Sequence, residues 1–356
     1  MAERSTLQQI LELARWAPSG DNTQPWRFEI ISDDHVAIHG HDTRDWCVYD
    51  FDGHASHMAH GALLETLRIA ASAHGLHAEW AVRAGQPDEA PVYDVKLVDA
   101  PDLQADALLP FIETRSVQRR PFRTTPLTES QREALRRSVG PGYSVCFFES
   151  PRERRRIARL LWSNAHIRLT CPEAFRVHRD VIEWGARYSA DRIPDQAVGV
   201  DPLTARLMRW VMGSWERVQF FNRFLFGTVA PRIQLDVLPA ILCAAHVLVR
   251  ADRAQVSMTD YVQAGIAMQR LWLTAEALDL RLQPQMTPLI FGWYARNRPE
   301  VSSAARVNAA VVQVDAALRE VLGVNDEGVF FCRVGSGRRA EARSLRLELA
   351  ALMKSR

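Results

Sequence analysis

The sequence is short of cysteines and of long apolar runs, and both shortages exclude classes of protein. Its 356 residues contain five cysteines, far apart and without a CxxC pair, which argues against a disulfide framework or a structural zinc site. The N-terminal MAERSTLQQI has no apolar signal core. The longest near-continuous apolar run, residues 237–249, is about 13 residues long against the roughly 20 that span a bilayer. We therefore expect a cytoplasmic protein without a membrane partner.

Lysine is also scarce, because Lys96 and Lys354 are the only lysines among 44 basic residues. The formal net charge of +2 is too small to indicate nucleic acid as a partner. Arginine forms planar, bidentate contacts with anions, so its abundance favours local anion sites. The composition, with 47% hydrophobic and 24% charged residues, is typical of a globular protein. The length allows two packed units.

Two apolar helices with similar patterns are predicted far apart in the chain. One reads GALLETLRIAASAHGL from Gly61 and the other GIAMQRLWLTAEALDL from Gly265, so that equivalent positions are 204 residues apart. The pattern fits either a duplication or two core helices with small residues where backbones approach. Further helix starts are predicted where a capping-box pair occurs, namely Ser5 with Gln8, Thr128 with Gln131, Ser150 with Glu153, and Ser257 with Asp260.

The segment from about 152 to 236 has no counterpart in the first half of the chain. It is rich in arginine at its start and aromatic later, between Trp210 and Phe226. Its apolar spacing is helical. We interpret it as either an inserted helical lid or additional core.

The loop within LARWAPSGDNTQPWRFEI, residues 13–30, carries the strongest chemical signal. A helix ends at Pro18, and short polar side chains then precede a strand that is predicted from Trp26 to Ile31. Glycine and small side chains allow a planar ligand to approach the backbone closely. Asn22 can both donate and accept, as the edge of a heterocycle requires. Without further information, a turn that satisfies its own backbone is the simpler explanation.

The string APSGDNTQPWRF resembles the signature loop of the nitroreductase superfamily, in which this loop lines the flavin ring of FMN. The resemblance implies that Pro18, Ser19 and Asn22 contact FMN. It also implies that Gln24, with the Pro-Trp that follows it, holds the loop against the core.

A second segment, TRSVQRRPFRTTPLTESQREAL from residue 114, has the composition of a phosphate site. Guanidinium groups and a small hydroxyl donor are suited to phosphate, and the segment offers Arg115, Ser116, Arg119 and Arg120. A solvated basic linker is the alternative. It resembles, more loosely, the arginine-serine element with which nitroreductases grip the FMN phosphate. Which of Arg119 and Arg120 would take the phosphate stays open.

Two further segments fit the same resemblance. LRLQPQMTP, residues 280–288, corresponds to a strand end beside the flavin, with Pro284, Gln285 and Met286 as candidates. Near the C-terminus, Arg343 and Arg346 are candidates for a basic segment that reaches the phosphate. No metal site is predicted: His54, His57 and His60 recur every third residue, but a solvated helix face explains them better than a ligand set.

The resemblance implies an α+β fold, a nitroreductase-like three-layer α/β/α sandwich with central antiparallel sheets. We expect halves at 1–110 and 111–356 that form an intrachain pseudo-dimer, with the helical insertion at 152–236. Because the signature loop lies in the first half and the phosphate element in the second, we expect one FMN per chain. The implied function is electron transfer between NADH, NADPH or an organic donor and a small acceptor such as a nitro compound or a quinone. A flavin-sequestering protein with little turnover is the alternative.

Overall fold

The computed structural model describes residues 4–298 and 300–354, and within them two four-stranded antiparallel sheets form the framework. The first sheet has the order β1-β2-β4-β3, and the second has the order β5-β9-β11-β10. The strands of the first sheet are β1 (Trp26–Ser32), β2 (His35–Gly40), β3 (Leu76–Val82) and β4 (Val92–Asp99). Those of the second are β5 (Tyr143–Phe148), β9 (Ala245–Ala251), β10 (Arg281–Pro284) and β11 (Gly328–Gly335).

The two sheets have the same topology. In each, a helix precedes the first strand, a long helix follows the second, and the fourth strand returns between the second and the third. The preceding helices are α1 (Thr6–Ala14) and α3 (Glu129–Ser138), and the long helices are α2 (His54–Ser72) and α10 (Met258–Ala277). All neighbouring strand pairs are antiparallel in both sheets, which confirms the predicted α+β class with antiparallel sheets.

The predicted helix starts are confirmed. Reciprocal capping boxes form at the ends of α1, α3, α10 and α4 (Pro151–Thr170), where each cap side chain accepts from the backbone three residues later. These bonds satisfy amide groups that have no partner within the helix, so each helix begins at the residue that the sequence indicates.

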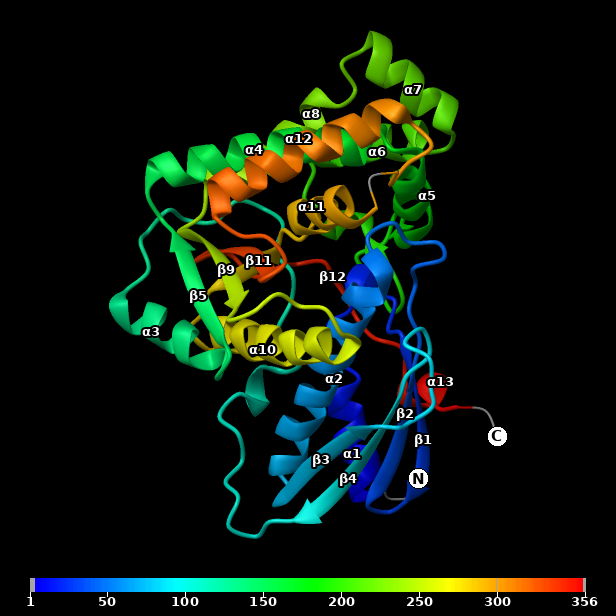
Figure 1. The fold of residues 1–356 in the computed structure, drawn as a ribbon, viewed down its shortest axis with the longest axis vertical. Coiled ribbons are helices and arrows are strands. Elements are labelled where there is room, and N and C mark those ends of the chain that lie inside the picture. The colour runs from blue at the N-terminus through cyan, green and yellow to red at the C-terminus, as the bar shows by residue number, and fades with distance from the viewer. Residues whose placement is uncertain (1–3, 299, 355–356) are drawn as a thin grey trace.

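Helices α2 and α10 cross at their glycines, between the two sheets (Figure 1). A Cβ atom added to Gly61 would overlap the carbonyl oxygen of Val262, and one added to Gly265 would overlap that of Met58. Only glycine permits backbones to approach this closely. Next to the crossing, Gln269 Nε2 donates to Thr66 Oγ1 at 2.9 Å.

The connection between β5 and β9 holds the insertion, somewhat longer than predicted. Its longer helices are α4, α5 (Pro172–Val181), α6 (Pro202–Val211) and α7 (Trp215–Phe224). It ends in α8 (Val229–Arg232), a π-helical turn at Ile233–Val237 and α9 (Leu238–Ile241). Between α5 and α6 lie the short strands β6 (Ile182–Glu183), β7 (Tyr188–Ser189) and β8 (Ile193–Pro194), then a 3₁₀ turn at Asp195–Ala197.

The second sheet is the middle of three layers, with helices on both of its faces. Alternate side chains such as Val247 and Leu248 enter separate cores on its two faces. One core is closed by α3 and α10, and the other by α4, α11 (Thr287–Asn297) and α12 (Ala305–Leu322). The first sheet packs on α1 and α2 with one face, while its other face carries partly or fully exposed charges such as Glu29 and Lys96.

The C-terminal segment crosses back to the first sheet. After β12 (Arg343–Ser344), the helix α13 (Leu349–Leu352) buries both of its leucines in the core of α1 and α2. The Lys354 amide donates to Phe28 O at 2.8 Å. Three 3₁₀ turns complete the chain, at Gly20–Asn22, Phe51–Gly53 and Leu109–Phe111.

No single helix in the described residues is long and apolar enough to cross a bilayer. Helix α7 and the segment Val229–Ile241 reach that length and composition only as a pair bent by 86°.

Candidate functional site

A cavity of about 350 Å³ lies where α2, α10, the insertion and the C-terminal segment meet. Its volume is near the lower end of the range for small-molecule sites, which is about 300–1,000 Å³. Ten of the thirteen residues predicted for the site line it. They are Pro18, Ser19, Asn22, Arg115, Ser116, Arg119, Pro284, Met286, Arg343 and Arg346.

The loop after α1 presents polar atoms to this cavity through an unusual backbone. Asp21, Asn22 and Gln24 all have positive φ angles, of 49°, 64° and 49°. Ser19 Oγ accepts from the Gln24 amide at 2.9 Å and closes the turn. Asn22 Nδ2 donates to Ala190 O at 3.1 Å, whereas its Oδ1 is buried and has no partner among the described residues. That oxygen is available to a ligand donor.

Gln24 holds the loop but does not line the cavity. Its Nε2 donates to Ala190 O at 2.9 Å, in the insertion. Its Oε1 accepts from the Leu347 amide at 2.9 Å, in the C-terminal segment. The side chain is fully buried, so these bonds connect three distant parts of the chain. Trp26, which is also fully buried, packs in the core of α1 and α2.

Three guanidinium groups gather at one end of the cavity. Arg115 donates to Trp16 O at 3.2 Å, Arg343 to Glu113 O at 2.7 Å and Arg346 to Ala17 O at 2.9 Å. These acceptors are backbone carbonyls, and none of the three arginines forms a salt bridge within the described part of the chain. The Nε atoms of Arg115 and Arg343 are buried without a partner there.

The electrostatics of this cluster favour an anion. Burial, with Arg343 nearby, lowers the pKa of Arg115 to about 9. Burial also lowers the pKa of Arg346, and the positive charges of Arg115, Arg343 and Arg15 lower it further. Bringing like charges together away from water is unfavourable, so a bound anion would relieve their repulsion.

Of the two adjacent arginine candidates, Arg119 lines the cavity and Arg120 is exposed. Arg119 Nη1 donates to Ala197 O at 3.2 Å and lies near the carboxylate of Asp21. Burial raises the pKa of Asp21, and the charge of Arg119 opposes that shift. This pair stands apart from the cluster of three arginines in its charge balance, because it brings its own carboxylate.

Pro284 and Met286 line the cavity, but Gln285 between them does not. The Gln285 amide donates to Phe331 O at 2.8 Å, and its side chain hydrogen-bonds with the buried His246 at 2.8 Å. Gln283, which was not predicted, lines the cavity instead.

The insertion contributes a wall that sequence reasoning missed. Arg168, His178, Ile193 and Ala197 line the cavity, whereas the aromatic residues of α6 and α7 do not. His178 Nε2 hydrogen-bonds with the Tyr49 hydroxyl at 2.9 Å. Burial, with Arg168 nearby, lowers the pKa of His178 to about 3, so its ring is neutral at pH 7. No local sequence pattern pairs residues 129 positions apart.

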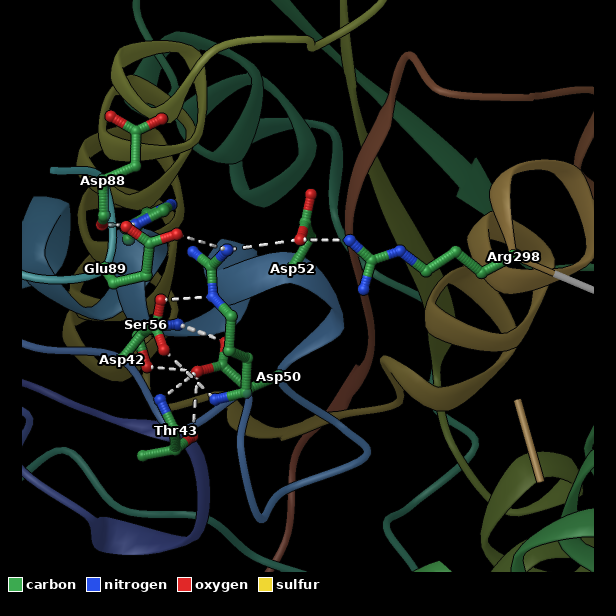
Figure 2. A network of polar contacts seen from close by, with 10 residues as sticks. Asp42, Thr43, Asp50, Asp52, Ser56, Asp88, Glu89 and Arg298 are labelled. Atoms are coloured by element: carbon green, nitrogen blue, oxygen red, sulfur yellow. Dashed lines mark hydrogen bonds and ion pairs between the residues drawn. The ribbon is translucent and has the colours of Figure 1, made fainter. Parts of the chain in front are cut away.

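The segment that carries Tyr49 is fixed by an acidic anchor (Figure 2). Asp50 accepts from the amide and hydroxyl of Thr43, at 2.7 and 2.8 Å, and from the amide and hydroxyl of Ser56, at 3.0 and 2.6 Å. Nearby, Asp52 accepts from Arg298 at 2.8 Å and so connects this segment to the end of α11.

The three histidines at the start of α2 are buried, so the predicted solvated helix face was wrong. His54 stacks on Tyr261 with ring centroids 3.7 Å apart. His57 hydrogen-bonds with Asp88 O at 2.9 Å, and His60 with Pro25 O at 2.7 Å. No group of metal-ligating side chains occurs among residues 4–298 and 300–354.

Comparisons with known proteins match the loop and its surroundings. Residues 3–51 match the model of the nitroreductase family. An uncharacterized protein of Mycobacterium tuberculosis is 25% identical over 336 residues, which are 91% of this chain. The chain spans 44% of the length of that relative.

Solved structures were also compared. The FMN-dependent nitroreductase NfnB of Mycobacterium smegmatis, solved with NADPH, is 15% identical with a TM-score of 0.37, covering 69% of this chain and 96% of its own. An iodotyrosine deiodinase bound to FMN and 3-iodo-L-tyrosine is 12% identical with a TM-score of 0.35, covering 68% and 95%. The family match covers the helix and loop at one wall of the cavity, so this part of the chain is similar to the nitroreductase family.

Proposed function

We propose that this chain is an FMN-dependent oxidoreductase that binds one FMN in the cavity. The observation that carries the proposal is the cluster of the buried Arg115 and Arg346 with the half-buried Arg343. It lacks a carboxylate partner in the described chain and adjoins the signature loop. A phosphate monoester provides the negative charge that such a cluster needs, and guanidinium groups bind it bidentately.

The remaining polar atoms suit the rest of this cofactor. Asn22 Oδ1 and the Nε atoms of Arg115 and Arg343 are buried without partners among the described residues, and they belong to side chains that line the cavity. Buried polar groups are seldom left unpaired, which indicates that a ligand supplies their partners. In the proposed arrangement, Ser116 joins the phosphate contacts, and Pro18, Ser19, Pro284 and Met286 border the ring system.

The two halves of the chain support one such site. Gly61 contacts Val262 while Gly265 contacts Met58, so each helix presents equivalent positions to the other at the 204-residue offset. Glu65 forms an ion pair with Arg270, and Thr66 a hydrogen bond with Gln269. At the same offset Glu65 is equivalent to Gln269 and Thr66 to Arg270, so these two contacts are reciprocal. A two-fold interface has this reciprocity. We infer a pseudo-dimer whose first half supplies the loop and whose second half supplies Arg115.

Bound FMN would supply two-electron redox chemistry, and the protein would supply position and electrostatics. Arg168 and the His178–Tyr49 pair on the opposite wall are placed to contact a second molecule, the electron donor or acceptor. Burial raises the pKa of the Tyr49 hydroxyl, so it is a neutral hydrogen-bonding group at pH 7. We propose a nicotinamide or organic donor and a small acceptor, such as a nitro compound, a quinone or a biosynthetic intermediate.

The test combines stoichiometry with reduction. Purified chain reconstituted with FMN should show one flavin per chain by absorbance, and NADH or NADPH should bleach the flavin band within a catalytic time scale. The protein would be a flavin-sequestering protein instead if it binds FMN, is not reduced by NADH or NADPH, and does not pass electrons to common nitro compounds or quinones. A chain that cannot retain FMN at all would reject the proposal.

A further inference from the structure

Helices α6 and α7 of the insertion expose apolar side chains almost without burial. None of the ten residues of α6 is buried, and α7 buries only Val218. Leu203 is 75% exposed and Phe226 79% exposed. We call Leu203, Leu207, Trp210, Phe220, Phe224 and Phe226 the aromatic patch; each is at least half-exposed.

The three rings of Trp210, Phe220 and Phe224 in this patch are linked by ring contacts, with Phe221 between Trp210 and Phe220. The rings of Phe220 and Phe224 are 5.2 Å apart, and Trp210 meets Phe221 at 5.8 Å. Single exposed apolar residues are ordinary, but a contiguous group indicates a binding surface. Figure 1 shows α6 and α7 at the end of the molecule farthest from the first sheet.

These helices are too short to be stable without a partner. A helix of ten residues is marginal in water, and most helical stability in proteins comes from packing an amphipathic face. On α6, inward packing is limited to partly buried side chains such as Met208, which packs against a small core that includes Cys47. On α7, Val218 is buried and Trp215 packs against Phe175. The apolar side chains of the aromatic patch, by contrast, point away from the protein.

The charge of the segment identifies the kind of partner. Residues 202–226 contain four arginines and one acid, Glu216. The arginines are all exposed and form no salt bridge within the described chain. Arg217 lies over the Trp210 ring at 4.7 Å, and Arg223 over the Phe224 ring at 5.3 Å. Positive charge is thus interleaved with aromatic surface.

We propose that α6 and α7 dock on an anionic lipid surface. Helices with arginine and bulky apolar residues lie in the plane of a membrane, with the apolar groups at the headgroup boundary and the guanidinium groups at the phosphates. A helix that spans a bilayer needs about 20 apolar residues. A helix that lies on the surface needs no such length.

The test is co-sedimentation of the full chain with vesicles of phosphatidylcholine, with and without phosphatidylglycerol. The chain should sediment with the anionic vesicles and stay in solution with the neutral ones. Replacing Phe224 and Phe226 together by Ser should abolish sedimentation. The pair Arg209→Gln and Arg223→Gln should weaken it about 30-fold, because each basic residue near an anionic surface contributes about a factor of five.

Matched controls exist elsewhere on the surface. Val256→Ser changes an apolar residue that is 80% exposed, and Arg137→Gln removes an exposed charge on α3; neither should affect sedimentation. Circular dichroism of every variant verifies that the fold is intact. Failure of the unmodified chain to bind anionic vesicles would overturn the proposal. A dimer in solution that the Phe224 and Phe226 variant dissociates would also overturn it, since the patch would then join two copies.

Discussion

At the residue scale, the cluster of Arg115, Arg343 and Arg346 allows the proposed phosphate contacts to be tested apart from the contacts to the flavin ring. Arg115 and Arg343 each offer a buried Nε without a partner in the described chain, next to the cavity. Hydrogen bonds to charged groups contribute about 1.5–3 kcal/mol. Replacing Arg115 or Arg343 by Ala should therefore weaken FMN binding about 10- to 150-fold. Riboflavin, which lacks the phosphate, should bind with nearly unchanged affinity.

Fluorescence titration with both flavins measures this difference, and Arg137→Ala is the control because it lies on the exposed face of α3. Arg120→Ala serves as a second control, since Arg120 is exposed and does not line the cavity. Equal losses for riboflavin and FMN would place the phosphate away from this cluster.

Gln24 acts on the loop through bonds to two distant segments. Gln24→Glu keeps the size and the acceptor for the Leu347 amide but loses the Nε2 donor to Ala190 O. Ala190 O still accepts from Asn22 Nδ2, whereas the Asn22 carbonyl loses the donor that Gln24 Nε2 provides at 3.0 Å. Leaving a buried acceptor unpaired costs about 1–3 kcal/mol. The variant should unfold at lower temperature in a calorimetric scan, whereas Gln9→Glu at an exposed position should leave the midpoint unchanged. Equal midpoints for the two variants would show that Gln24 does not anchor the loop.

Site residues could be predicted where they follow one another in the sequence. The loop from Pro18 to Trp26 is a single string, so its contribution was visible in the sequence. The choice between Arg119 and Arg120 was not, because adjacent side chains point in different directions and no pattern fixes which one faces inward. Tyr49 and His178 meet only because the insertion folds back on the loop after β2, a tertiary event with no local signature.

At the element scale, the crossing of α2 and α10 sets the distance between the two sheets. Gly61→Ala would drive a Cβ into the Val262 carbonyl, and Gly265→Ala one into the Met58 carbonyl. Backbone cannot move aside without separating the helices, so each should destabilise the fold by about 1–3 kcal/mol or more. Chemical denaturation measures the loss.

Gly292→Ala is the matched comparison for these substitutions. It also lies in a buried helix, but its nearest neighbour is the flexible end of Leu318. We expect a smaller loss than at either crossing glycine. A loss at Gly292 equal to that at Gly61 would mean that close backbone approach is not what these glycines provide.

Helix boundaries could be predicted from the sequence more fully than the packing of distant segments against each other. Capping boxes and the glycine-containing helices have short-range causes, so their boundaries followed from residues three or four positions apart. The return of α13 to the first sheet depends on a contact between Lys354 and Phe28, which no local pattern encodes. The sequence alone therefore does not reveal that the C-terminal segment packs on the first sheet.

At the scale of the whole molecule, neutral buried histidines set the response to acid. The pKa of His54, His60 and His178 is lowered to about 3 and that of His246 to about 4, in each case chiefly by burial. An unfolded histidine takes up a proton near pH 6.5, whereas the folded ones stay neutral to much lower pH. The stability that they contribute is therefore complete above pH 6.5 and declines as the pH falls toward 3 to 4.

The unfolding midpoint of the FMN-free chain should thus be steady from pH 8 to about 7 and decrease steeply below about pH 6. Replacing the fully buried His60 by Asn removes one titrating group, so this variant should lose less stability between pH 7 and 5 than the unmodified chain, even if it is less stable at pH 7. His74→Asn is the control, because His74 is exposed and its removal should leave the acid slope unchanged. A His60 variant with the same acid slope as the unmodified chain would assign the loss to carboxylates instead. His178 also lines the cavity, so its protonation at low pH would place a positive charge beside Arg168. Acid should therefore affect the site as well as the stability of the fold.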